Sequence, residues 1–232
     1  KLALEQADKA NQSKSRFLAA ASHDLLQPMH AARLFSTALE QSVSSAEDQQ
    51  TLQQLDRALY GAESMLSALL DIARLEGGTI QPKRQAYSLH DLLNDLELQF
   101  KSIAAQRNIQ LSVHDTRFWV DTDPQWMRRI IQNFVSNALR YTAHGRVVVG
   151  VLRSAQRPNH IRIGVWDTGP GINEQQRVKL FQEFERCGHT SPWGEQGLGL
   201  GLAIVQRMTS LLDFPVHVYS ELGKGSCFII EV

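Results

Sequence analysis

The chain has 232 residues, 43% of them hydrophobic, and its 24 Lys and Arg residues balance 24 Asp and Glu residues to zero formal net charge. This composition supports a folded core and excludes a wholly disordered chain, and it shows none of the basic excess expected of a nucleic-acid-binding protein. The two cysteines, Cys187 and Cys227, have no ligand-like spacing, so neither a disulfide framework nor a zinc site is indicated, and a reducing compartment is favoured.

Residues 1–76 are predicted to form two long helices. Apolar residues recur at alternating spacings of three and four from Leu18 to Leu39 and again from Leu52 to Ala73, and a polar break at 42–48 separates the two runs. This spacing is typical of helices that pack side by side in a hairpin. Two helices with one apolar face each make a thin core, so we expect a second copy to complete a four-helix bundle.

The composition of the chain changes after Gly77-Gly78, a helix-ending pair that Pro82 follows. The remainder predicts an α/β domain, with helices near 88–106, 123–142 and 198–212 and strands near 109–114, 147–151, 161–166, 216–220 and 226–232. We therefore expect two domains, residues 1–78 and 83–232. No apolar run approaches the roughly 20 residues of a membrane helix, and the helix-favouring start indicates a fragment of a longer protein.

His23 is the first candidate for chemistry. It lies two positions before the seam residue Leu25, about 200° around the helix, so its imidazole is expected to face away from the core. Asp24 is a candidate to hold one ring N–H and leave the other nitrogen free to attack phosphorus. Pro28 should bend the helix one turn later. Taken alone, His23 is better interpreted as a solvated surface residue, which is also how we interpret His30.

The predicted helix at 123–142 begins at Asp123-Pro124, a good helix start. Asn133 and Asn137 lie one turn apart and present two neutral amides on one face, and Arg140 follows three residues later. Neutral oxygen ligands suit a Mg²⁺ ion that already shares its charge with phosphates. In isolation, these residues are also compatible with the ordinary polar face of a helix.

Two glycine-rich segments complete the candidate site. In Asp167-Thr168-Gly169-Pro170-Gly171, a carboxylate at a strand end could accept a hydrogen bond from an exocyclic amine, and the glycines would admit a flat ring. In Gly197-Leu198-Gly199-Leu200-Gly201, unhindered N–H groups at the start of a helix suit phosphate oxygens. Between them, Phe181 and Phe184 are expected to anchor a loop that extends to Gln196 and covers the nucleotide.

The order and spacing of these segments resemble those of sensor histidine kinases. Ser22-His23-Asp24 with Pro28 resembles the phosphoacceptor box, and Asn133 with Asn137 resembles the asparagine box. The glycine segments resemble the adenine-binding and second glycine boxes, and Phe181 with Phe184 the phenylalanine box. The resemblance implies a dimeric helical hairpin followed by an ATP-binding α/β sandwich of the type shared with Hsp90, gyrase and MutL.

The resemblance also implies roles for individual residues. His23 would accept the γ-phosphoryl group of ATP and pass it to an aspartate of a response-regulator receiver domain, in the bacterial cytoplasm. Asn137 would hold Mg²⁺, with Asn133 near the phosphates. The remaining expected contacts are Arg140 and Arg186 to phosphate, Tyr141 lining the pocket, Asp167 with Gly169 and Gly171 at adenine, and Gly197, Leu198, Gly199 and Gly201 at the phosphates.

Two departures from the family pattern keep an alternative open. Leu26 stands where the family usually has Arg or Lys, and Gln27 where many members place Thr or Asn to position water for receiver dephosphorylation. The alternative is a nucleotide-binding module that acts on a receiver mainly as a phosphatase or scaffold, with little autokinase activity. A third possibility, an ATP-driven clamp, does not account for a helix with an outward histidine.

Overall fold

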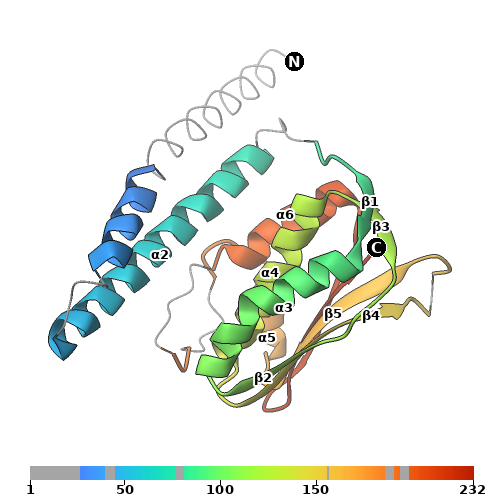
Figure 1. Ribbon diagram of the computed structural model, residues 1–232. Helices are drawn as coiled ribbons and strands as arrows, with labels where there is room; N and C mark the ends of the chain where they lie inside the picture. Colours follow the sequence, from blue (N-terminus) through green and yellow to red (C-terminus); the bar gives the residue numbers. More distant parts are fainter. Residues whose placement is uncertain (1–26, 40–44, 77–80, 156, 186–190, 194–198) are drawn as a thin grey trace. The chain divides into compact units, whose positions relative to one another are not determined.

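The computed structural model describes residues 27–39, 45–76, 81–155, 157–185, 191–193 and 199–232. The chain divides into two compact units, Lys1–Gln81 and Pro82–Val232. Figure 1 shows the elements of both units. Within the described ranges, no helix is both long and apolar enough to cross a membrane.

The first unit contains a helix at 27–39 and the 31-residue helix α2 (Ala46–Glu76), which form a hairpin. Ser45 precedes α2 and its hydroxyl accepts a hydrogen bond from the Asp48 N–H at 3.1 Å, which satisfies a donor that the helix itself leaves unpaired. A buried carboxylate links the two helices, because Arg33 donates to Glu63 at 2.9 Å. The predicted pair of helices is thus confirmed over residues 27–39 and 46–76, and the earlier part of the first predicted helix lies outside the described residues.

The hairpin buries only part of its apolar surface in one chain. Leu52, Ala68 and Ile72 are buried, whereas Leu34 and Phe35 are 72% and 69% exposed. The predicted seam residues Leu39 and Leu55 are also exposed. An apolar stripe of this kind is normally covered by another element.

The second unit is built on a mixed five-stranded sheet whose spatial order is β2-β4-β5-β7-β6. β2 runs parallel to β4, and the other neighbours are antiparallel. A separate two-stranded antiparallel sheet pairs β1 with β3. The strands are β1 (Gln85–Ser88), β2 (Ile109–Val113), β3 (Trp119–Thr122), β4 (Gly145–Arg153), β5 (Ile161–Asp167), β6 (Val216–Glu221) and β7 (Gly225–Glu231).

Three helices cover one face of this sheet, as Figure 1 shows: α3 (Leu89–Gln106), α4 (Pro124–Tyr141) and α6 (Gly201–Leu212). The short helix α5 (Glu174–Lys179) follows β5. The core lies between the helices and the sheet, where the rings of Phe134 on α4 and Phe228 on β7 stack at 5.4 Å between centroids. Alternate β5 residues such as Ile163 and Val165 are fully buried against it, as expected for a sheet covered on this face.

The segment that enters the second unit is fixed to two of these helices. The Lys83 N–H donates to the Asp123 carboxylate at 2.8 Å, and that carboxylate also caps α4. The Arg84 guanidinium donates to the carbonyl of Leu212 at the end of α6 and lies 5.3 Å from the centroid of the Phe214 ring. Residues 83 and 84 therefore contact the beginning of one helix and the end of another.

The predicted helices and strands of the second unit are confirmed, with β4 longer at both ends than expected and the last helix beginning at Gly201 instead of near 198. Three further elements, β1, β3 and α5, were not predicted from the sequence. β1 and β3 have four residues each and α5 has six, and segments this short carry too few repeats for a periodic pattern to be recognised.

Candidate functional site

Asp167 is the last residue of β5, and its side chain shares the helix-covered face of the sheet with Val165. Its Oδ1 accepts hydrogen bonds from the N–H groups of Gly169 at 2.8 Å and Ser226 at 3.3 Å. Oδ2 accepts none from any residue that the structure describes. Burial raises the pKa of the Asp167 carboxyl above its ordinary value, and the two backbone hydrogen bonds oppose that rise only in part. One carboxylate oxygen is thus left available to an external donor.

The turn after Asp167 is hydrogen-bonded to β6 and to the turn between β6 and β7. The Gly223 N–H donates to the Pro170 carbonyl at 2.8 Å, and the Ile172 N–H donates to the Ser220 hydroxyl at 2.8 Å. Gly171 has φ +73°, and a Cβ atom there would lie 2.1 Å from the Glu221 carbonyl oxygen. Because no larger residue fits at position 171, glycine is required for the two turns to meet.

Helix α4 supplies the amides of the site. The Asp123 side chain accepts from the N–H groups of Gln125 and Trp126, and Pro124 occupies the first turn. The apolar stripe of α4 is buried, whereas Asn133 and Asn137 are partly exposed. Asn133 donates to the Arg129 carbonyl at 2.8 Å, which fixes its side chain.

Helix α4, which carries Asn133 and Asn137, contacts the glycine-rich start of α6 directly. A Cβ atom on Gly201 would lie 2.5 Å from Oδ1 of Asn133, so the close approach of α6 to α4 depends on glycine at position 201. The residue that precedes α6 is Leu200, whose side chain cannot accept a hydrogen bond from the first turn. The first-turn N–H groups of α6 therefore have no side-chain cap, and a helix start of this kind suits an anion.

The prediction that Phe184 anchors the loop is wrong. Its side chain is 62% exposed and does not anchor the loop, contrary to the expectation from the sequence. The backbone holds this position instead, because the Phe184 N–H donates to the Gly199 carbonyl at 3.1 Å. Phe181, by contrast, lines a hollow of about 300 Å³ at α6 together with Thr209 and Phe214.

Of the predicted site residues, those of the phosphoacceptor and of the loop lie outside the described residues: His23, Asp24, Arg186, Gly197 and Leu198. Gln27 is exposed in the first helix. The structure brings Asn133 to Gly201, and it brings the Tyr141 backbone to Gly169, whose Cβ atom would lie 3.4 Å from the Tyr141 carbonyl oxygen. Asn137, Arg140 and Tyr141 are partly exposed on the last two turns of α4.

Thr142, the residue that directly follows α4, was not among the residues predicted from the sequence. It is fully buried, and its Oγ1 has no hydrogen-bond partner among the residues that the structure describes. That oxygen would lie 3.3 Å from a Cβ atom on Gly169, beside the Asp167 turn. The only sequence signal was its position directly after Tyr141.

The site as a whole has two chemically different parts. The Asp167 turn offers a hydrogen-bond acceptor and open backbone, which suit a heterocyclic amine. The meeting point of α4 and α6 offers neutral amides and a helix start, which suit phosphates and a hydrated cation. A purine nucleotide combines the two kinds of group that these parts would bind.

Two family models match successive parts of the chain. Residues 13–78 match the His Kinase A (phospho-acceptor) domain, and residues 122–232 match the histidine kinase-, DNA gyrase B-, and HSP90-like ATPase. Among relatives, the autoinducer 2 sensor kinase/phosphatase LuxQ of Vibrio vulnificus is 30% identical over 100% of this chain and 28% of its own length. The sensor histidine kinase AruS of Pseudomonas aeruginosa is 33% identical over 99% of this chain and 24% of its own length.

Solved structures of histidine kinases have the same fold. Full-length ShkA in complex with AMPPNP superposes with a TM-score of 0.75 and 26% identity, over 94% of this chain and 46% of that one. The Acinetobacter baumannii histidine kinase AdeS gives a TM-score of 0.61 at 19% identity, over 90% of this chain and 96% of that one. The chain spans about a quarter of the length of the two relatives above. With both domains present in this order and matched over most of the sequence, the chain belongs to the sensor histidine kinases.

Proposed function

We propose that this chain is the catalytic portion of an ATP-dependent protein-histidine autokinase that phosphorylates His23 and passes the phosphoryl group to a receiver aspartate. In this proposal, residues 1–78 dimerise and carry the phosphoacceptor, and residues 83–232 bind ATP. The observation that supports it most is the contact of Asn133 with Gly201, because it places a neutral amide at an uncapped helix start. A reaction that draws on cellular ATP is proposed to take place in the cytoplasm.

The nucleotide would be held by both parts of the site. Asp167 would accept from the exocyclic amine of adenine through Oδ2, with Gly169 and Gly171 admitting the ring and Tyr141 lining the pocket. The N–H groups at Gly199 and Gly201 would face the phosphates. In the loop, Gly197, Leu198 and Arg186 are assigned to the phosphates from the family pattern alone.

Asn137 is proposed to hold Mg²⁺. Its amide lies one turn from Asn133 on α4, and it makes no hydrogen bond with a residue that the structure describes, so its oxygen fits a metal that takes its other ligands from phosphates and water. The ion would neutralise phosphate charge that develops during transfer. Asn133 and Arg140 would complete the phosphate contacts from the same helix.

The proposed transfer needs a neutral imidazole. A bond forms between one ring nitrogen of His23 and the γ-phosphorus while the bond from that phosphorus to the leaving oxygen of ADP breaks. Asp24 would hold the other ring N–H and stabilise the positive charge that the ring gains. The phosphoramidate then passes its phosphoryl group to a carboxylate oxygen of the receiver aspartate, and the imidazole is regenerated.

A homodimer is proposed from the uncovered apolar stripe of the hairpin, which includes Leu34, Phe35, Leu39 and Leu55. Covering this stripe with a second hairpin would complete a four-helix bundle. Phe35→Glu should shift sedimentation from dimer to monomer. Leu98→Glu is the matched control, because Leu98 on α3 is equally exposed and lies in the other unit. If both variants sediment like the unmodified chain, the hairpin is not the dimer interface.

The test of the kinase itself is phosphate transfer from radiolabelled Mg-ATP. We expect an acid-labile, base-stable label that disappears in His23→Gln and remains in His30→Gln, a control on the exposed face of the same predicted helix. Label that persists in His23→Gln would refute the assignment of the phosphoacceptor. Adding receiver domains should remove the label from the kinase.

A second activity, dephosphorylation of the receiver, is favoured by Gln27. This residue is exposed on the first helix, four positions after His23, and its amide could orient a water molecule. LuxQ is named a sensor kinase/phosphatase. Gln27→Ala should slow loss of phosphate from a phosphorylated receiver without changing autophosphorylation, and an unchanged rate would leave Gln27 without this role.

A further inference from the structure

Residues 191–193 form a small docked segment at the C-terminal end of α4. Ser191 is only 5% exposed, and its hydroxyl donates to the Arg140 carbonyl at 3.0 Å. The Trp193 N–H donates back to the same hydroxyl at 3.2 Å. One serine side chain therefore ties the backbone of this segment to the last turn of α4.

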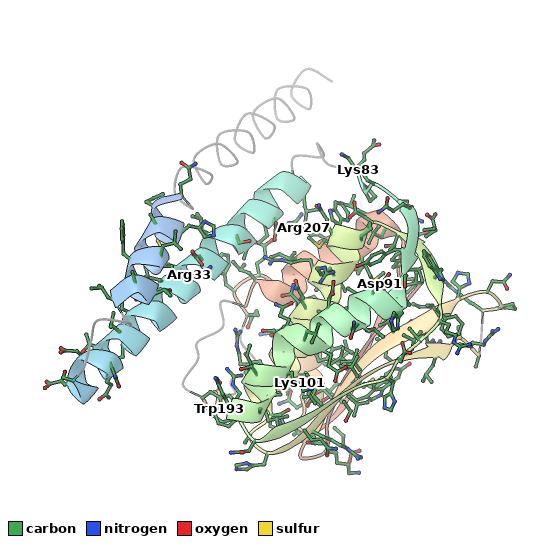
Figure 2. The ribbon with its side chains drawn as sticks, viewed as in Figure 1. Arg33, Lys83, Asp91, Lys101, Trp193 and Arg207 are labelled. Carbon is green, nitrogen blue, oxygen red and sulfur yellow. The ribbon has the colours of Figure 1, made fainter. Side chains whose placement is uncertain are left out.

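The Trp193 ring lies against a second residue that holds the same helix end. The Arg107 guanidinium is 5.5 Å from the ring centroid, and it donates to the Leu139 carbonyl at 3.2 Å. Arg107 caps the C-terminus of α3, and Figure 2 shows Trp193 near that end of the helix. Ser191 and Arg107 thus satisfy two successive carbonyls, Leu139 and Arg140, that a helix leaves without internal donors.

The end of α4 that is held in this way includes or adjoins the residues assigned to metal and phosphate. Asn137 and Arg140 both lie on the last two turns of α4. The final turn of a helix frays unless its carbonyls are paired, and fraying moves the side chains that project from it. A nucleotide that needs Asn137 and Arg140 in place would therefore bind more tightly when residues 191–193 are docked.

We infer that Ser191 and Trp193 are positioning residues for the phosphate end of the nucleotide site, because they lock the last turn of α4. This inference rests on the proposed function, since it takes Asn137 and Arg140 as metal and phosphate contacts. When residues 191–193 hold the C-terminal end of α4, the affinity for the triphosphate is higher. The binding of adenine at Asp167 does not depend on this segment.

The test compares the affinities of ATP and adenosine for the full chain by calorimetry, and adds hydrogen exchange at 138–142 without nucleotide. Ser191→Ala should weaken ATP binding by roughly three- to tenfold, the usual effect of one lost hydrogen bond. Adenosine affinity should stay unchanged, and exchange at 138–142 should accelerate. Trp193→Phe keeps a ring for Arg107 and should keep ATP affinity, whereas Trp193→Ala should behave like Ser191→Ala.

Ser210→Ala is the matched control, because the Ser210 hydroxyl also donates to a helix carbonyl, that of Gln206 in α6, at 2.8 Å. It should change neither affinity. Equal losses of ATP and adenosine binding in Ser191→Ala would indicate a general folding defect and overturn the inference. Accelerated exchange with unchanged ATP affinity would overturn it as well. Failure of the unmodified chain to bind ATP or adenosine would instead refute the proposed function, and the inference with it.

Discussion

Two carboxylates at opposite ends of the same strand pair have contrasting surroundings. Asp167 ends β5 opposite Ser226, whereas Glu231 ends β7 opposite Arg162, on the other face of the sheet. Glu231 is 3% exposed, and it accepts from Arg162 at 3.2 Å and from the Ser154 hydroxyl at 3.0 Å. Arg157 and His217 lie 3.9 and 3.5 Å away. Asp167 receives two backbone donors on one oxygen, and it forms no ion pair with any residue in the described ranges.

The pKa values shift in opposite directions for this reason. Burial works to raise the pKa of Glu231, but hydrogen bonds from Ser154 and Arg162 and the charges of Arg162 and Arg157 outweigh it and lower the pKa. At Asp167 burial prevails and the pKa rises. A carboxylate with a full set of partners stabilises the fold, whereas one that keeps an unpaired oxygen in a buried position is suited to a ligand.

The largest expected effect is on nucleotide binding. Asp167→Asn replaces an acceptor oxygen and should weaken binding of ATP and adenosine alike by roughly 10- to 100-fold, the range for a hydrogen bond to a charged group. Stability at pH 7 should not fall, because the change removes a carboxylate whose ionisation burial disfavours. Titration calorimetry and urea unfolding check both parts. Retained affinity would show that Asp167 does not bind the base.

Glu231→Gln should have the opposite effect to Asp167→Asn: it should lower the stability of the fold and leave nucleotide binding unchanged. Removing the charge leaves Arg162 beside a neutral amide and should lower the free energy of unfolding by about 1–3 kcal/mol. Nucleotide affinity should stay unchanged, because Glu231 lies on the other face of the sheet. Urea unfolding of Glu231→Gln and Asp167→Asn in parallel measures the difference. Equal destabilisation of the two variants would show that the two carboxylates do not differ in this way.

The pH dependence of stability sharpens the comparison. The pKa of Glu231 is lower in the folded than in the unfolded chain, so its contribution is present above pH 4.5 and is lost as the pH falls through the folded value. The pKa of Asp167 is raised, so its contribution is greatest below pH 3.8 and is lost as the pH rises through the folded value. Glu231→Gln should therefore lose less stability than the unmodified chain on acidification, and Asp167→Asn should lose more. Urea unfolding at a series of pH values checks both slopes.

The smallest effect is expected at Arg157, the most exposed of the basic residues around Glu231. Arg157 is more exposed than Arg162 and lies farther from the carboxylate. Arg157→Ala should cost about 0.5 kcal/mol or less, as is usual for exposed pairs, and the cost should shrink further in high salt. Arg162→Ala should cost more. Thermal unfolding at two salt concentrations checks the order, and the reverse order would show that Arg157 holds Glu231.

The sequence was most informative where one local pattern determines one element. The Asp123-Pro124 start and the apolar stripe of α4 predicted that helix to within a residue at each end, and the strand before Asp167 was expected from its alternation. Contacts between distant segments carried no such signal. The docking of Ser191 on Arg140, the stacking of Arg107 on Trp193 and the burial of Glu231 depend on residues far apart in the chain.

The prediction for Phe184 failed for a related reason. Phe184 was expected to anchor the loop together with Phe181, but its φ is +62°, its side chain is exposed, and its backbone N–H makes the contact with Gly199 instead. The spacing of apolar residues in a sequence does not predict the backbone conformation of a single residue. Thr142 was missed because what places it beside the Asp167 turn is its proximity to Gly169, which is distant in sequence.

The attachment of residues 83 and 84 has a mechanical consequence. The Asp123 carboxylate is shared between the first turn of α4 and the Lys83 N–H, and Arg84 is bound to the last carbonyl of α6. Tension applied at Pro82 would therefore act directly on the beginning of α4 and the end of α6, as well as on β1. Residues 83 and 84 thus attach the entering segment at two points, one at the beginning of α4 and one at the end of α6.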